Sequence, residues 1–249
     1  MRIAALYDIH ANLPALEAVL VDIRRQAVDR VVVGGDIVPG PIARETMACI
    51  TKIDLPTEFL QGNGDREVLA WMRGQRASSL PKKAIEAIRW TAQEMDSGHA
   101  SLLASWAPTL QYEIRGLGNV LFCHATPTSD TDHFTRLTPD ERLSPIFERT
   151  GADLVVCGHT HMQFDRTVGK VRVLNAGSVG MPFGEAGAYW LLLTPSGTQL
   201  RYTPYDLAAA AERIRATQYP QAEQFAGQNI LHPPAEETML QLFEKIALQ

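Results

Sequence analysis

The sequence predicts an α/β fold made of layered strands and helices, and three observations support this class. Residues 1–61 alternate short apolar runs with helix-like segments. Five apolar runs along the chain end at polar residues, as strands do when their carboxyl ends form a site. Short turns join the late strand-like runs, which favours antiparallel pairing. At 249 residues, the chain suits one large domain with a sizeable core, so we expect residues 1–249 to form a single domain.

The first third of the chain is expected to run strand, helix, strand, helix, strand. Asn12 is a good N-cap and Pro14 suits the first turn of the helix that follows it. A second helix is expected near residues 42–52, after a loop rich in proline and glycine. The strands of this βαβαβ opening are expected at residues 3–7, 30–34 and 57–61.

The middle of the chain and its end are expected to differ in structure. Residues 66–108 indicate a mostly helical, cap-like segment, and a further helix is expected near residues 139–150. Residues 206–249 indicate a helical tail with a structural role, broken at Pro220 and at Pro233. The remaining strands are expected at residues 110–115, 119–123, 153–157, 164–168, 171–174, 188–194 and 199–204.

Composition narrows the classes of function. The chain is 45% hydrophobic and 20% charged, which is ordinary for a globular protein. Its net charge of −5 argues against non-specific nucleic-acid binding. No apolar run resembles a signal peptide or is long enough to span a bilayer. We therefore expect a cytoplasmic protein without a membrane partner. Three widely spaced cysteines indicate reduced thiols and not disulfides.

Polar residues of the types that bind metal ions follow five of the predicted strands. Carboxylate, imidazole and amide groups without cysteine suit Mn²⁺, Fe, Co²⁺, Ni²⁺ or Zn²⁺ held by five or six ligands. Seven ligands are too many for one such ion but suit two ions that share a bridging carboxylate. The sequence therefore predicts two divalent transition metal ions at the strand ends, with Mn²⁺ the first choice. The seven residues are Asp8, His10, Asp36, Asn63, His124, His159 and His161.

The ordered set of motifs resembles the calcineurin-like metallophosphoesterases. The motifs are Asp8-x-His10, Gly35-Asp36, Gly62-Asn63-x-Asp65, His124 and Gly158-His159-x-His161, spread over roughly residues 1–180. The segment from Asn175 to Pro182 is similar to the small prokaryotic phosphodiesterase branch. The resemblance implies a four-layer αββα sandwich of two mixed β-sheets flanked by helices, with a dinuclear metal site at the carboxyl ends of the strands.

The resemblance also implies a role for each matched residue. Asp8, His10 and His161 would hold the first metal. Asn63, His124 and His159 would hold the second, and Asp36 would bridge the two. A metal-bound hydroxide would attack phosphorus in line with the leaving group, while both metals and Asn63 offset the charge on the phosphoryl oxygens. Asp65 would orient a neighbouring group. Asp36, Asn63, Asp65 and His124 are therefore the expected catalytic residues.

Several positions depart from the family pattern or need a second interpretation. Many members of the resembled family have histidine where this chain has Gly64, and that histidine is placed to protonate the leaving oxygen. In this chain the proton must come from water or from His133, or the leaving group must be acidic enough to depart without one. A solvated loop position is the preferred interpretation for His133. Gly158 is expected in a backbone conformation that other residues resist. Ser178 is expected in a tight turn and not as a nucleophile, because no histidine–acid pair accompanies it.

The leading hypothesis is a metal-dependent phosphodiesterase acting on a small phosphate ester, nucleotide-like substrates included. The enzymatic alternatives are a nucleotide or protein phosphatase and a dinucleoside polyphosphate hydrolase. A third hypothesis is a non-catalytic protein-binding scaffold on the same fold, as in one retromer subunit. Scaffolds tend to lose ligands and this chain keeps all seven, which favours the enzyme. The other partner that we consider is a second copy of the chain, which would pack against the C-terminal helices.

Overall fold

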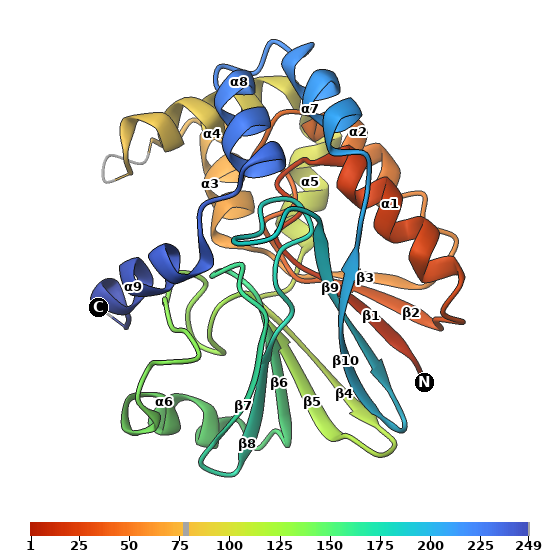
Figure 1. The fold of residues 1–249 in the computed structure, drawn as a ribbon, viewed down its shortest axis with the longest axis vertical. Coiled ribbons are helices and arrows are strands. Elements are labelled where there is room, and N and C mark those ends of the chain that lie inside the picture. Colours follow the sequence, from red (N-terminus) through yellow and green to blue (C-terminus); the bar gives the residue numbers. More distant parts are fainter. Residues whose placement is uncertain (77–79, 249) are drawn as a thin grey trace.

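The computed structural model describes residues 1–76 and 80–248 and contains two five-stranded sheets that pack face to face (Figure 1). The first sheet has the order β10-β9-β1-β2-β3 and the second has the order β4-β5-β6-β8-β7. The strands are β1 (Ile3–Leu6), β2 (Arg30–Val33), β3 (Thr57–Phe59), β4 (Thr109–Ile114), β5 (Gly118–Cys123), β6 (Leu154–Cys157), β7 (Phe164–Val168), β8 (Val171–Asn175), β9 (Ala188–Thr194) and β10 (Gly197–Thr203).

Both sheets are mixed. In the first sheet β1, β2 and β3 run parallel, while β9 is antiparallel to both β1 and β10. In the second sheet β5, β6 and β8 run parallel, and β4 and β7 add antiparallel edges. The antiparallel pairing expected from the short late turns is confirmed for β7 with β8 and for β9 with β10.

The period of two along each strand divides its side chains between two cores. In β1, Ala4 and Leu6 face the helices while Ile3 and Ala5 face the second sheet. In β6, Leu154 and Val156 contribute to the layer between the sheets, and Val155 and Cys157 contribute to the outer layer beyond them. Three apolar layers therefore separate four layers of structure, and the predicted αββα sandwich is confirmed.

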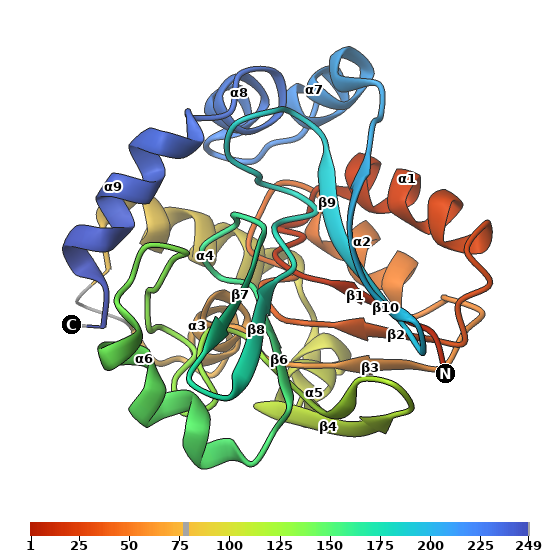
Figure 2. The same ribbon diagram turned by 60° about the horizontal axis from the view of Figure 1, so that its bottom comes forward.

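Helices cover the outer face of each sheet (Figure 2). The first sheet is covered by α1 (Leu13–Arg24), α2 (Ala43–Ile50), α3 (Asn63–Met72), α4 (Lys82–Glu94), α5 (Ser97–Ser105) and α7 (Leu207–Arg215). The second is covered by α6 (Asp140–Phe147), whose Leu143 and Phe147 belong to the outer apolar layer. The predicted cap of α1 is confirmed, since the side-chain oxygen of Asn12 accepts a hydrogen bond from Ala15 N at 3.2 Å.

The tail contains more structure than the sequence indicates. Between α7 and α9 (Glu236–Ile246), the chain forms α8 (Ala222–Phe225) and then a π-helix, Ala226–Leu231. Figure 1 shows α7 and α8, in blue, above the first sheet, and α9 lower down beside the site end of the second. There, Leu248 N donates to His133 O at 2.9 Å. Within the described ranges, no helix combines the length and the apolar character needed to cross a bilayer.

Candidate metal centre

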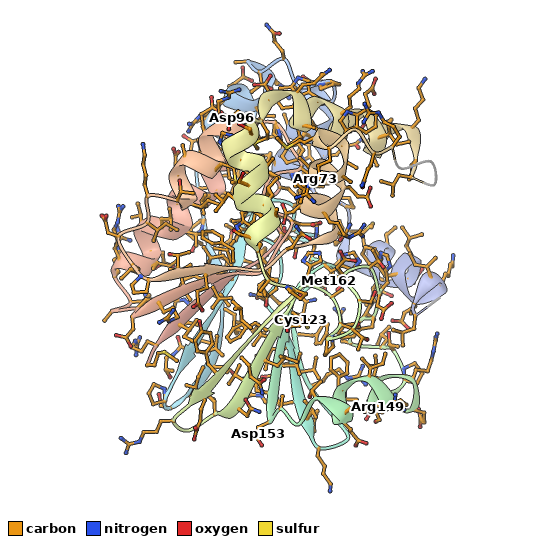
Figure 3. The ribbon with its side chains drawn as sticks, turned by 180° about the vertical axis from the view of Figure 1, so that it is seen from behind. Arg73, Asp96, Cys123, Arg149, Asp153 and Met162 are labelled. Carbon is orange, nitrogen blue, oxygen red and sulfur yellow. The ribbon has the colours of Figure 1, made fainter. Side chains whose placement is uncertain are left out.

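The polar residues that follow the strands lie together at one edge of the two sheets. β1 leads into Asp8 and His10, β2 leads into Asp36, and β5 and β6 lead into the three later histidines. Figure 3 shows the molecule from behind. Cys123 and Met162, the chain neighbours of His124 and His161, lie near its middle. Arg149 and Asp153, which precede β6, lie toward its lower end. Because the parallel strands share a direction, their carboxyl ends meet where the sheets adjoin.

One group of ligand-type atoms comes from Asp8, His10 and His161, whose ligand atoms all lie within 4.8 Å of one another. His161 Nε2 is 3.3 Å from Asp8 Oδ1 and 3.1 Å from His10 Nε2. Asp8 is fully buried, and its Oδ2 accepts a hydrogen bond from His159 N at 2.9 Å. These are the three residues expected around the first metal.

A second group comes from Asp36, His124 and His159, again within 4.8 Å. Asn63 completes it, because one end of its amide lies 3.1 Å from His124 Nε2 and 3.0 Å from His159 Nδ1. The amide oxygen is the end that a cation would bind there. The structure thus brings all seven predicted ligands together. It places His161 in the first group and His159 in the second.

Asp36 lies between the two groups. Its Oδ2 is 3.8 Å from His10 Nε2, and its Oδ1 is 3.6 Å from His124 Nε2. The Oδ1 atom also accepts a hydrogen bond from Gly64 N at 2.7 Å, which fixes the carboxylate plane. A carboxylate with one oxygen toward each group has the geometry that a bridging ligand needs.

Backbone carbonyls orient three of the imidazoles. The Nδ1 atoms of His10, His124 and His161 face the carbonyl oxygens of Pro39, Gly34 and Met181 at 3.3, 2.9 and 2.7 Å. A proton on Nδ1 donated to the carbonyl leaves the Nε2 lone pair directed into the centre. His159 is reversed, since its Nδ1 faces the centre and its buried Nε2 has no partner among the described residues.

The donor set fits cations. Asp8 Oδ1 is buried and has no hydrogen-bond partner among the described residues, although it lies between two imidazoles. Burial alone would raise the pKa of Asp8, but His161 outweighs this and holds it below its usual range. Burial and His161 lower the pKa of His10, while burial and His124 lower that of His159. A buried anionic oxygen such as that of Asp8, and neutral imidazoles such as those of His10 and His159, are ligands that divalent transition metals prefer.

The backbone conformation of the Gly158 turn differs from the prediction. The left-handed residues are His159 (φ 66°) and His161 (φ 59°), and Gly158 has no positive φ. Glycine is required at position 158 for space, because a Cβ there would lie 2.4 Å from Asp8 Oδ2 and 2.5 Å from Tyr7 Cδ1. The predicted reason for this glycine is therefore wrong, and close approach is the actual one.

Asp65 lies beside the centre, and its hydrogen bonds with the described residues all come from backbone N–H groups. Its Oδ1 accepts from Ile37 N at 2.9 Å and Val38 N at 3.1 Å, and its Oδ2 accepts from Gly62 N at 3.1 Å. It therefore ties the loop after Asp36 to the loop before Asn63. Burial and the nearby Asp36 raise its pKa to about 7.

Ser178 is fully buried and structural in its contacts. Its hydroxyl donates to Asp8 O at 2.7 Å and accepts from Met181 N at 2.7 Å. Neither group is a general base, which agrees with the expectation that Ser178 is not a nucleophile.

Gly64 and His133 both lie near the second group. A Cβ at Gly64 would lie 2.5 Å from Pro39 Cγ, so a histidine there requires the Pro39 loop to move. His133 lies in a loop, as expected, and is half-buried there. Its ring lies 4.5 Å from that of His159 and stacks on Phe243 at 5.2 Å, measured between centroids.

Two cavities adjoin the centre. One, of about 490 Å³, includes His10, Asp36 and Asn63 in its wall and extends between α3, α4 and the tail. The other, of about 560 Å³, includes His124 and extends past Trp106 and the loop at Thr126–Asp130. Arg66 borders both. The tail, expected to be only structural, forms one wall of the first cavity, and no local sequence pattern indicates this because the contacts join distant segments.

Comparison with known proteins gives the family. Residues 1–197 match the model of the calcineurin-like phosphoesterase superfamily domain, which is most of the chain. The chain belongs to the calcineurin-like phosphoesterase superfamily. This family hydrolyses phosphoesters with divalent metal ions, and the two groups of carboxylate and imidazole ligands have the composition such ions need.

Relatives extend over nearly the whole chain. An uncharacterised protein of Methanocaldococcus jannaschii is 29% identical over 238 residues, covering 88% of this chain and 94% of its own. The structure is similar to a hypothetical protein of Pyrococcus horikoshii, with a TM-score of 0.80, 18% identity, and coverage of 94% and 99% of the two chains. It is also similar to a metallophosphoesterase from Sphaerobacter thermophilus, with a TM-score of 0.72, 24% identity, and coverage of 93% and 98%.

Proposed function

We propose that this phosphoesterase is a dinuclear metal-dependent phosphodiesterase. The observation that carries the proposal is the pair of cavities that adjoin the centre. A phosphodiester has two organic arms and needs room for both, whereas a monoester needs room for one. Both cavities have the volume of small-molecule sites.

The residues divide the work in the proposed reaction. Asp8, His10 and His161 would hold one ion, Asn63, His124 and His159 the other, and Asp36 both. Bound ions supply a nucleophilic water and offset charge on the phosphoryl oxygens. Asp65 is a positioning residue, because it holds the loops of Asp36 and Asn63 through three backbone N–H groups.

The charges around the centre favour a diester over a polyphosphate. Arg66 is the cation that lines the cavities within the described residues. Its guanidinium is already paired with Asp130 at 2.7 Å and with Glu67 at 2.7 Å. A dinucleoside polyphosphate carries several phosphates that need unpaired cations, and the cavities offer none among those residues.

A test compares esters before and after metal removal. We expect protein stripped with a chelator to be inactive and Mn²⁺ to restore activity. Position 64 offers no general acid, so aryl diesters such as bis(p-nitrophenyl) phosphate should react well ahead of p-nitrophenyl phosphate and of alkyl esters. Restored activity that favours the monoester would contradict the proposal. A protein purified without chelator that holds no metal would support the scaffold hypothesis.

A further inference from the structure

The first cavity has a second wall that belongs to none of the family motifs. Beyond the candidate ligands, its apolar side is formed by Ala84, Ala87 and Ile88 of α4 and by Phe225 of α8. The two small alanines on α4 and the flat ring of Phe225 give this side of the cavity a slot that suits a flat ring. This slot opens directly onto Asp36 and Asn63, so a group bound in it would be joined to the reacting phosphate.

Side-chain amides line the tail side of the slot. Gln221 Nε2 donates to Lys83 O at 2.7 Å, and Lys83 Nζ donates to Gln224 Oε1 at 2.7 Å. Gln224 Nε2 then donates to Gln228 Oε1 at 3.1 Å. This chain of bonds holds the tail against α4 and engages one end of the Gln228 amide. The NH₂ group of Gln228 and both ends of the half-buried Asn229 amide have no protein partner among the described residues.

Two consecutive residues of the π-helix, Gln228 and Asn229, carry amide side chains at this cavity. The segment Ala226–Leu231 is wound more widely than an α-helix, and His232 N donates to Gly227 O, five residues earlier, at 2.9 Å. Gln228 and Asn229 both line the cavity. π-Helical turns are rare and occur frequently at functional sites.

Charge excludes a second phosphate from this slot. Apart from the candidate metal ligands, its charged lining residues among those described are Arg66 and Glu67, which pair with each other at 2.7 Å. An uncharged arm is therefore the better match. A free amide offers both a donor and an acceptor, as the edge of a nucleobase does, and Asn and Gln read such edges in pairs of hydrogen bonds.

We propose that the slot binds the nucleoside arm of a phosphodiester, with the base between α4 and Phe225 and its edge hydrogen-bonded to Asn229 and Gln228. This inference rests on the proposed function for the phosphate, but the slot itself needs no turnover. Asn229 is thereby assigned as the residue that determines specificity for the base.

The test measures binding of adenosine, guanosine, cytidine and uridine by calorimetry. These probes carry no phosphate, so hydrolysis plays no part. We expect saturable binding of at least one, weakened about tenfold in Asn229→Ala through loss of its hydrogen bonds. Gln199→Ala is the matched control, because Gln199 is exposed on β10, away from the slot. Binding of none of the four, or equal affinity in native protein and Asn229→Ala, would overturn the proposal.

A rate measurement separates this inference from the proposed function. With Mn²⁺, a nucleoside 5′-(p-nitrophenyl phosphate) should react with a higher kcat/KM than methyl p-nitrophenyl phosphate, and Asn229→Ala should reduce that ratio about tenfold. A ratio unchanged by the substitution, with both esters still hydrolysed, would overturn the slot and leave the phosphodiesterase. Nucleoside binding without hydrolysis of either ester would leave the slot and overturn the phosphodiesterase.

Discussion

At the scale of single residues, the centre concentrates backbone conformations that most residues avoid. Six residues other than glycine have positive φ in the loops of the centre, namely Asp8, His10, Ala11, Asp36, His159 and His161. Each such conformation costs on the order of 1–3 kcal/mol and persists only when the surrounding structure holds it. The φ of 52° at Ala11 shows that a methyl group is tolerated in a left-handed turn beside the centre.

Gly158→Ala should disrupt the first metal group. The added Cβ would lie 2.4 Å from Asp8 Oδ2, so either Asp8 or the His159 turn must shift. We expect the variant to lose most of its metal while remaining folded, as measured by metal content and circular dichroism. Gly227→Ala is the control, because nothing lies within 4 Å of its added Cβ. Full metal content in Gly158→Ala would show that the two loops are looser than their contacts indicate.

Asp36→Asn should weaken both metals together. The substitution replaces a shared anion whose two oxygens face His10 and His124 at 3.8 and 3.6 Å. We expect turnover to fall by about 10² or more, because the spacing of the pair depends on the bridge. Asp54→Asn, at an exposed position, should change neither metal content nor rate. Native activity at full occupancy in Asp36→Asn would rule out a bridging role.

At the scale of secondary-structure elements, local patterns predicted the strands and the ligands but not the walls around them. The ligands follow apolar runs directly, so the residues near Asp8 and His124 could be placed from the chain alone. The π-helix could not, because nothing in Ala226–Leu231 distinguishes it from an α-helix until it packs against α7 and α8. The ring contacts of His133 could not be predicted for the same reason, since its partner Phe243 lies on α9, far along the chain.

Two truncations of the tail should behave differently. Ending the chain after Asp206 removes Ile214, Phe225 and Ile230, all buried in the core over the first sheet. Ending it after Pro234 removes α9, whose buried residue is Leu240. The burial of this leucine contributes roughly 2 kcal/mol to the free energy of unfolding. We expect the first protein to unfold or aggregate and the second to fold and keep its metals, as judged by thermal unfolding and metal content. Equal Tm values for the two would contradict this division of the tail.

At the scale of the whole molecule, metal removal should lower stability. The centre joins loops from both sheets, and Asp8 Oδ1 is buried without a protein partner among the described residues. An ion that binds only the folded chain stabilises it by about 2.7 kcal/mol when present at 100 times its Kd. We therefore expect Tm to fall after chelation and to rise again with increasing Mn²⁺, by calorimetry. A Tm independent of Mn²⁺, in protein shown to bind it, would mean that the unfolded chain binds equally well.

The two cavities that adjoin the centre give the last prediction. Ala84 lines the first and Thr128 lines the second, so Ala84→Phe and Thr128→Phe should each fill one side. Both variants should slow bis(p-nitrophenyl) phosphate, whose two arms occupy both cavities. Methyl p-nitrophenyl phosphate has one bulky arm, which must depart in the reaction. Only the variant that fills the cavity of the leaving group should therefore slow it.

Metal content and Tm should stay native in both variants, since neither position supplies a ligand. The kcat/KM of each variant for each ester then identifies which cavity holds the departing group. If the first cavity holds the nucleoside arm, the departing p-nitrophenolate occupies the second. Thr128→Phe should then slow hydrolysis of the methyl ester, and Ala84→Phe should leave its rate unchanged. Native rates for the larger diester in both variants would show that its arms lie outside the cavities, and the structural argument for a diester would then fail.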